Sequence, residues 1–154
     1  MSSFEFDLKN ITPDELRHHI TTDLSMQVSI RNHLGLLEEY IDWVIAGKKN
    51  TTVRYRSGMA DLPKSFILPV ISTDPRIMRE GYQVGIAHLK KLTIKPFGEL
   101  NDEDAHNDGF QSLIQLKDAL RSIYGKINDK EIVSIYSFDY ENGLDLRWPN
   151  TTCM

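Results

Sequence analysis

The longest strand candidate in the chain, YQVGIAHLKKLTI at residues 82–94, sets the first constraint on the fold. Its side chains separate into two sets that alternate with a period of two, which is the pattern of a β-strand. The same alternation predicts that Lys90 and Lys91 point to opposite faces of the sheet. Shorter segments of the same kind predict further strands at residues 26–31, 50–56, 66–72 and 130–140.

Helical patterns fall between these strands. Residues 12–20 begin with a capping box, in which Thr12 is the N-cap and Glu15 lies three residues further on. Apolar side chains recur at helical spacing over 33–46, and Gly47 is well placed to end that helix. Two more helices are predicted, a short one at about 101–109 and a longer one at 112–124.

The order of these elements constrains the fold class. It runs helix, strand, helix, three strands, two helices, strand, and so lacks the regular strand–helix alternation of a doubly wound parallel sheet. We therefore expect an α+β protein, with a small, mostly antiparallel sheet or barrel and helices packed at its ends. A chain of 154 residues fits one such domain. Residues 1–11 are predicted to be a loose lead-in, and the 12–20 helix to lie outside the barrel.

Several classes of protein are disfavoured. No segment approaches the roughly 20 consecutive apolar residues of a membrane-spanning helix, so we expect no membrane contact. The N-terminus MSSFEFDLKN has neither the basic nor the apolar region of a secretory signal. Cys153 is the only cysteine, which leaves no disulfide partner within the chain and argues against a thiolate zinc site. These features fit a cytoplasmic protein.

Metal ligands do not gather in the sequence either. The five histidines are scattered, and the acidic run DEDAH at 102–106 is interpreted as a solvated helix start, where the helix dipole favours acidic side chains. We therefore expect no metal and no cofactor.

The segment AGKKNTTVRYRSG, residues 46–58, departs from the charge of the rest of the chain. The protein has a formal net charge of −4, yet this segment concentrates lysine, arginine and threonine. An acidic protein does not coat nucleic acid by bulk charge, so any such contact must be local. Strand alternation after Gly47 predicts that Val53 and Tyr55 face the core and that the opposite face carries Thr52, Arg54 and Arg56.

Two interpretations of this segment remain open. The residues GKKNTTVR match the pattern G-x-K-x-x-T-x-R through Gly47, Lys49, Thr52 and Arg54. On one interpretation they bind an anionic ligand, because a guanidinium holds phosphate in bidentate fashion or stacks on a base. On the other they are structural, since lysines often cap the carbonyls of a helix end and threonine and arginine are ordinary on exposed strands.

The surrounding sequence resembles a known family, the ASCH domains of the PUA-like superfamily. VSIRNHLGLLEEYIDWVIAGKKNTTVRYRSG is similar to the family's strand, helix and signature strand. ELNDEDAHNDGFQSLIQLKDALRSIYG is similar to its segment with an acidic residue before Gly-Phe and a Ser-capped helix ending in Tyr, and KEIVSIYSFDY to its closing strand. The resemblance divides the chain into an N-terminal extension at 1–25, an ASCH/PUA-like domain at 26–140 and a C-terminal tail at 141–154.

The resemblance implies a small β-barrel of about five or six strands, with a cleft beside the signature strand. It implies binding of RNA, a nucleotide or a modified nucleoside, through Lys48, Lys49, Thr52, Arg54, Arg56 and Arg31. The alternative is an amidohydrolase acting on an acylated, acetylcytidine-like nucleoside. Some family members use a lysine, a threonine and a glutamate for that reaction, which correspond here to Lys49, Thr52 and Asp108. Aspartate is one methylene shorter than glutamate, which is a departure from the family pattern.

Overall fold

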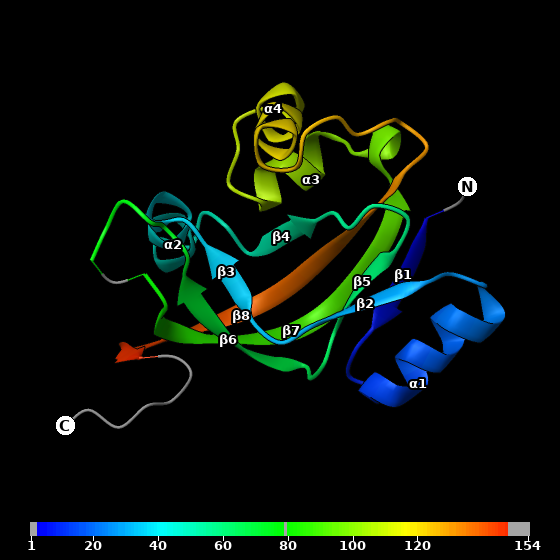
Figure 1. Ribbon diagram of the computed structural model, residues 1–154, viewed down its shortest axis with the longest axis horizontal. Coiled ribbons are helices and arrows are strands. Elements are labelled where there is room, and N and C mark those ends of the chain that lie inside the picture. Colours follow the sequence, from blue (N-terminus) through cyan, green and yellow to red (C-terminus); the bar gives the residue numbers. More distant parts are fainter. Residues whose placement is uncertain (1–2, 79, 148–154) are drawn as a thin grey trace.

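Two long antiparallel strands form the middle of the protein (Figure 1), in a computed structural model that describes residues 3–78 and 80–147. They are β7 (Tyr82–Pro96) and β8 (Ile132–Arg147), which pair from one end to the other. The predicted strand at 82–94 is thereby confirmed. The last strand extends beyond the predicted 130–140, because backbone pairing with β7 continues to Arg147. Residues 148–154, including Cys153, lie outside the described part of the chain.

The other strands flank this pair. One sheet has the order β3 (Leu34–Leu36), β6 (Ile67–Ser72), β7, β8 and β4 (Thr51–Arg54), and β1 (Phe4–Asp7) also pairs with β7. A second sheet joins β2 (Val28–Arg31) and β5 (Ala60–Pro63). The β2–β5 and β3–β6 pairs are parallel and the others antiparallel. The main sheet curls into a half-barrel with flanking helices, as the predicted α+β class requires (Figure 1).

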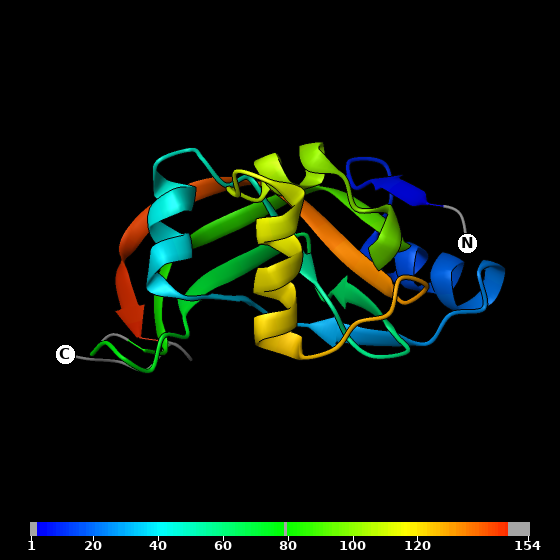
Figure 2. The ribbon, with the colours of Figure 1, turned by 90° about the horizontal axis from the view of Figure 1, so that it is seen from above.

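The helices lie at the edges of this half-barrel. They are α1 (Pro13–His18) with the π-helical turn η1 (His19–Asp23), α2 (Glu38–Ile45), the 3-10 turn η2 (Phe97–Glu99), α3 (Asp102–Asn107) and α4 (Leu113–Tyr124). Thr12 and Glu15 form the predicted capping box, and Ser112 caps α4. Figure 2 shows α2 and α4 side by side above the sheet, on the side where the candidate site lies.

Four segments differ from the sequence-based predictions. The helix predicted at 33–46 begins only at Glu38, because residues 34–36 pair with β6 as strand β3. β5 forms between the strands predicted at 50–56 and 66–72, where no strand was predicted, and β1 forms within the predicted loose lead-in. The π-helical turn carries the 12–20 helix on to Asp23. The three unpredicted strands are short and are held by partners far away in the sequence.

Two hydrophobic clusters stabilise the fold. The larger one includes Leu16 and Ile20, which are fully buried together with Leu92 and Ile94 of β7. The first helix therefore packs its buried side chains against the main core. The prediction that it lies outside the barrel stays a prediction. The smaller cluster lies under α4 and contains Val53 and Tyr55 on the predicted core face of β4, with Phe97, Leu116, Leu120 and Ile135.

Among the described residues, no helix combines the length and the apolar character that crossing a membrane would need.

Candidate functional site

A cavity of about 220 Å³ opens between α2, β4 and α4. Its volume is below the roughly 300–1,000 Å³ of pockets that hold drug-sized ligands, so it suits a ligand with one small ring system. Most of the wall is apolar, from Leu36, Leu37, Leu116, Leu120 and Ile123. The polar groups belong to a few residues, which include Lys49, Thr52, Arg54 and Asp108.

Lys49 reaches the cavity because of how α2 ends. The chain leaves the helix through Gly47, whose φ of +79° is the left-handed conformation that glycine adopts without strain. The backbone N–H groups of Lys48 and Lys49 donate to the Trp43 carbonyl oxygen at 2.9 and 3.1 Å. This turn directs Lys49 inward, where its side chain is only 4% exposed. The predicted end of the helix at Gly47 is thus also the device that buries the lysine.

Asp108 approaches from the end of α3. It is the C-cap residue of that helix and is followed by Gly109, which has a φ of +95°. A Cβ atom at Gly109 would lie 2.7 Å from the ring of Trp43, so only glycine allows this close approach to α2. The Asn50 backbone N–H also donates to the Asn107 carbonyl oxygen at 2.9 Å. Together these contacts hold the Asp108 carboxylate against Lys49.

Lys49 and Asp108 form a buried ion pair in the cavity wall. The Lys49 ammonium donates to the Asp108 carboxylate and lies 3.5 Å from the Asp108 carbonyl oxygen. Burial lowers the pKa of Lys49 well below its ordinary value, and the charge of Arg54 lowers it further. The dipole of the preceding helix favours the charged form, but desolvation outweighs it. Lys49 is therefore closer to the neutral, basic amine than an exposed lysine is.

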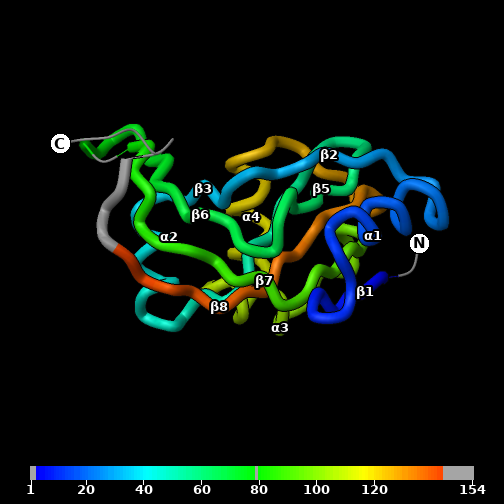
Figure 3. Tube along the Cα trace, turned by 90° about the horizontal axis from the view of Figure 1, so that it is seen from below, coloured from blue at the N-terminus to red at the C-terminus, as the bar shows by residue number. Residues whose placement is uncertain are grey.

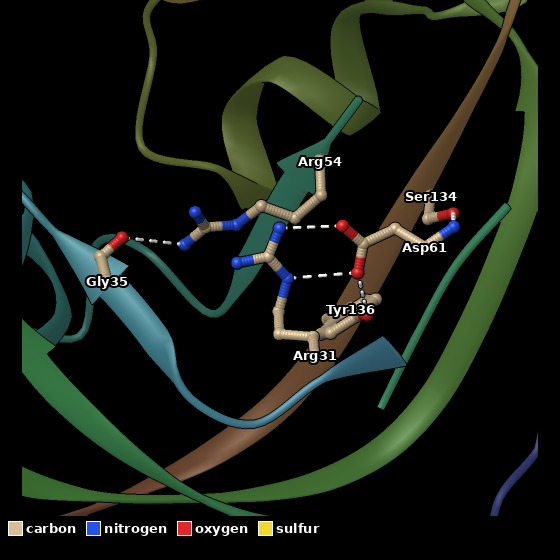
Figure 4. A network of polar contacts seen from close by, with 6 residues as sticks. All are labelled: Arg31, Gly35, Arg54, Asp61, Ser134 and Tyr136. Carbon is tan, nitrogen blue, oxygen red and sulfur yellow. Dashed lines mark hydrogen bonds and ion pairs between the residues drawn. The ribbon is translucent and has the colours of Figure 1, made fainter. Parts of the chain in front are cut away.

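Thr52 and Arg54 share one face of β4, as strand alternation predicted, and both line the cavity. Thr52 is buried. Arg54 donates from one terminal nitrogen to the Gly35 carbonyl oxygen at 3.0 Å (Figure 4), while its buried Nε has no partner among the described residues. Burial lowers the pKa of Arg54, and the nearby charge of Arg31 acts in the same direction.

A second buried ion pair lies beside Arg54 (Figure 4). Arg31 binds Asp61 in bidentate fashion, with Nε–Oδ1 and terminal nitrogen–Oδ2 distances of 2.9 and 2.6 Å. The Tyr136 hydroxyl donates to the same carboxylate, and the Asp61 backbone N–H donates to the Ser134 hydroxyl oxygen at 3.0 Å. Burial opposes the charge of Arg31, but the hydrogen bonds and charge of Asp61 raise its pKa overall.

The region around the Arg31–Asp61 pair carries more positive than negative charge, because Arg54 lies beside it. Arg31 and Arg54 are both cationic groups, and Asp61 is the carboxylate that lies with them in the network of Figure 4. Burial and the charge of Asp61 raise the pKa of Tyr136, which keeps its phenol neutral. Arg31 itself is not among the residues that line the cavity. Its guanidinium is held by Asp61 beside Arg54 (Figure 4).

The remaining predicted cations lie elsewhere. Lys48 is exposed, with its Nζ 4.5 Å from the centroid of the Trp43 ring. Arg56 is exposed beyond the end of β4, where its backbone bridges to Met59. Of the predicted set, the cavity brings together Lys49, Thr52, Arg54 and Asp108, and leaves out Lys48, Arg56 and Arg31.

Aromatic residues complete the wall, and the sequence analysis did not assign them to the site. Tyr40, Phe110 and Tyr124 line the cavity. Phe110 packs edge-on against Tyr40 and Trp43, with centroid distances of 6.0 and 5.3 Å. The sequence did offer one signal for assigning Phe110 to the site, because this residue directly follows Asp108 and Gly109. The sequence offered no such signal for Tyr40, because an aromatic residue on the apolar side of a helix is usually a core residue.

The acidic segment 102–106 has structural roles. Asn101 caps α3, and the Asp104 carboxylate completes the capping box by accepting from the Asn101 backbone N–H at 3.0 Å. Asp104 also pairs with Lys95 at 2.7 Å, and Asp102 accepts from the Leu113 backbone N–H at 3.3 Å. Within residues 3–78 and 80–147, no group of three or more histidine, cysteine or acidic side chains is placed to hold a metal ion.

The fold resembles crystal structures of ZmASCH from Zymomonas mobilis. A tyrosine-to-phenylalanine variant of that protein matches with a TM-score of 0.53 and 18% identity over 78% of each chain. A serine-to-alanine variant matches with a TM-score of 0.52 and 17% identity, over 74% of this chain and 71% of the other. No protein-family model and no curated protein matches the sequence. The protein therefore has the fold of ASCH domains, as the sequence resemblance implied.

Proposed function

We propose that the protein binds a nucleoside or nucleotide, free, modified or within RNA, in the cavity between α2, β4 and α4. The observation that carries this proposal is the division of one small cavity into an aromatic and apolar wall and a cationic end. Tyr40 and Phe110 offer surfaces on which a base stacks, and aromatic side chains take up bases in this way. Thr52 and Lys49 supply polar contacts to the edge of the ring.

The charge balance supports a ligand with anionic or strongly hydrogen-bond-accepting groups. Arg54 is the guanidinium that reaches the cavity, and the neighbouring Asp61 is already committed to Arg31 and Tyr136. A phosphate or a base carbonyl is the complementary group for such a donor. Within the basic segment GKKNTTVR, we therefore assign the anion-binding role to Lys49 and Arg54.

A matched pair of variants on α4 tests where the ligand binds. Ala119 lines the cavity, and Ser122 lies on the exposed side of the same helix. We expect Ala119→Phe to fill the cavity and abolish binding, and Ser122→Phe to leave it unchanged. Binding is measured by native mass spectrometry against a panel of nucleosides, nucleotides and modified nucleosides, with a thermal melt as a control for folding. Equal binding by both variants, or no binding by the wild-type protein, would overturn the proposal.

The second candidate function is hydrolysis of an acylated nucleoside. It is favoured by one observation: Lys49, Asp108 and Thr52 all line the same cavity, and the pKa of Lys49 is lowered as a base requires. In this proposal the Thr52 hydroxyl attacks the acyl carbon and neutral Lys49 accepts its proton. The proton passes to the amino nitrogen of the base as the amide C–N bond breaks. Water then hydrolyses the Thr52 ester, and Asp108 orients Lys49.

Incubation with N4-acetylcytidine separates the two functions. A binding protein leaves the nucleoside intact, whereas the hydrolase releases cytidine and acetate, which mass spectrometry and chromatography distinguish. We expect Thr52→Val to retain nucleoside binding and to lose any hydrolysis, since valine keeps the shape of threonine and lacks the hydroxyl. Wild-type protein that binds N4-acetylcytidine without turning it over would exclude the hydrolase for this substrate.

A further inference from the structure

The end of the Lys49 side chain lies at the cavity and is largely shielded from water. The side chain is 4% exposed, and Lys49 is one of the residues that line the cavity. Its Nζ lies 5.7 Å from the centroid of the Tyr40 ring and contacts the Asp108 carboxylate. Tyr40 and Asp108 line the same cavity, so both neighbours of the amine border that space. A ligand in the cavity is therefore adjacent to the amine.

The preceding lysine shows what the cavity changes. Lys48 has the same side chain but is exposed, with its Nζ over the Trp43 ring. An exposed lysine is almost entirely protonated near neutral pH, so it has no lone pair with which to attack a carbon atom. Burial lowers the pKa of Lys49, and the charge of Arg54 lowers it further. Desolvation and a neighbouring cation are the two conditions that turn a lysine into a nucleophile toward carbonyl carbons.

Asp108 supplies an acceptor for the proton that the amine must lose. The Lys49 ammonium donates to this buried carboxylate and lies 3.5 Å from the Asp108 carbonyl oxygen. Transfer of one proton along the first contact converts two buried charges into a neutral amine and a neutral carboxylic acid. Burial favours the neutral forms of both groups, because desolvation penalises charge. Asp108 can then return the proton in a later step.

The remaining walls indicate what kind of molecule the amine meets. α4 forms one wall, and in the view from below it lies behind β7 and β8 (Figure 3), so the cavity is on the α4 side of the sheet. The cavity has room for one small ring, which Phe110 and Leu116 border. Arg54 lines it as well and uses one terminal nitrogen on the Gly35 carbonyl oxygen, which leaves further N–H donors. A carboxylate or phosphate on the ring is the group that complements such a guanidinium.

We propose that Lys49 forms an imine with a small aromatic aldehyde that carries an acidic group and is held in this cavity. The aldehyde carbon is the electrophile, the apolar and aromatic wall holds the ring, and Arg54 holds the acidic group. This activity goes beyond the functions proposed above, because neither of them forms a bond to Lys49. It uses the same cavity but does not require a nucleoside as the ligand.

The groups at the cavity balance this reaction. One proton of the ammonium moves to Asp108, and the Lys49 nitrogen then attacks the aldehyde carbon while the carbonyl π electrons move to the oxygen. A second proton moves from the nitrogen to that oxygen, which gives a carbinolamine. Asp108 returns its proton to the hydroxyl, which leaves as water while the nitrogen lone pair forms the C=N bond. The product is a protonated imine beside the Asp108 carboxylate, so the charges of the ion pair are preserved and no oxidant or reductant is needed.

Reductive trapping in the wild-type protein tests the proposal directly. The probes are benzaldehydes with a carboxylate at each ring position, and benzaldehyde itself is the uncharged comparison. Sodium cyanoborohydride reduces an imine to a stable secondary amine, and peptide mapping by mass spectrometry finds the modified lysine. At about pH 7 we expect at least about tenfold more label at Lys49 than at Lys48, because an amine whose pKa is lower by one is about tenfold more often neutral. Equal label at the two positions, or label on exposed lysines alone, would overturn the proposal.

A matched pair of arginine variants provides the control. Lys49→Arg keeps the positive charge and removes the amine, and Lys48→Arg makes the same exchange at the exposed neighbour. We expect Lys49→Arg to lose most of the total label at limiting aldehyde, and Lys48→Arg to be labelled as the wild type is. Equal labelling of the two variants contradicts the proposal. Thermal melts show whether each variant is folded, and the wild-type peptide map decides the question if Lys49→Arg is not.

Recognition of the acidic group is tested with Arg54→Gln. In the wild type we expect the ratio of Lys49 label to Lys48 label to be several-fold higher for the best carboxybenzaldehyde than for benzaldehyde. The variant should lose this preference, because it lacks the cation. A change in the reactivity of Lys49 itself affects both aldehydes alike, so the ratio isolates the acidic group. No preference in the wild type, or a preference that persists in the variant, would refute an acidic ligand.

The two variants on α4 separate this proposal from the proposed function. We expect Ala119→Phe, which fills the cavity, to lose the label at Lys49, and Ser122→Phe to retain it. Equal labelling of these variants would show that the aldehyde does not reach Lys49 through the cavity, and the proposal would fail. If the wild type binds nucleosides but Lys49 is not preferentially labelled, only the imine proposal fails. If Lys49 is preferentially labelled but the wild type binds no nucleoside, the proposed function fails and the reactive lysine remains.

Discussion

Two buried ion pairs in the described part of the chain, Arg31–Asp61 and Lys49–Asp108, are built differently. Arg31–Asp61 has two hydrogen bonds between the charged groups, and Tyr136 adds a third to the carboxylate. Lys49–Asp108 has a single contact between ammonium and carboxylate, beside an open cavity. The pKa of Arg31 is raised by its partner, whereas burial lowers the pKa of Lys49. Well-satisfied pairs hold their charges, and poorly satisfied ones give up a proton more easily. The first pair therefore fits a structural role and the second a chemical one.

The largest expected effect comes from removing Asp61. Asp61→Ala leaves the guanidinium of Arg31 buried without its carboxylate, next to Arg54, and breaking such a pair costs about 3–5 kcal/mol. Urea unfolding measures the loss. Ser134→Ala is the matched control, because it removes only the acceptor of the Asp61 backbone N–H, at about 1 kcal/mol. A loss for Asp61→Ala no larger than that of the control would show that this pair is not the structural one.

Removing Asp108 is expected to cost less. Asp108→Ala leaves Lys49 unpaired, but this lysine can become neutral, so we expect a loss of about 1–3 kcal/mol in unfolding free energy. Nucleoside binding, and any hydrolysis, should fall more than stability does, because Lys49 loses its orientation in the cavity wall. The same urea experiment, paired with native mass spectrometry, checks both. A variant as unstable as Asp61→Ala would remove the contrast between the two pairs.

The smallest effect is a pH dependence that Lys49 contributes. The pKa of Lys49 is lowered in the folded protein, whereas an unperturbed lysine has a pKa of about 10.4. At pH values between the lowered pKa and about 10.4, the unfolded state therefore binds more protons at Lys49 than the folded state does. Stability from this group therefore rises with pH across that range, by at most about 1.4 kcal/mol per pH unit. Unfolding measured between about pH 7 and pH 9 should show a less positive slope for Lys49→Met than for wild type. Parallel slopes would mean that the lysine keeps its ordinary pKa.

Much of the fold follows from local sequence signals. The period of two over 82–94 predicted β7, and the glycine after an apolar helical stretch predicted the end of α2 at Gly47. The capping residue Thr12 marked the start of α1. These signals are readable because each depends on residues within a few positions of one another. For the same reason the pattern from Gly47 to Arg54 contains Lys49, Thr52 and Arg54, three of the four polar residues named above in the cavity wall.

The residues that the sequence analysis missed depend on distant partners. Asp61 gave no signal, since no helix or strand was predicted at its position. Its importance comes from Arg31, 30 residues before it, and Tyr136, 75 residues after it. Lys48 and Lys49 are adjacent and chemically alike in the sequence. The turn after Gly47 leaves the first exposed over Trp43 and buries the second.

The sequence by itself determined the α+β class, the long central strand, the start of α1, the end of α2 and the chemical groups of the basic motif, because periodicity and capping act over short distances. Only the tertiary structure decided which of those groups meet. Lys49 and Asp108 are 59 residues apart, and the approach of α3 to α2 at Gly109 brings them together. A β-bulge at Lys90 interrupts the alternation that predicted opposite faces for Lys90 and Lys91, and it exists only because β8 has one residue fewer at that point. Contacts between distant segments depend on packing and on strand register, which no local pattern encodes.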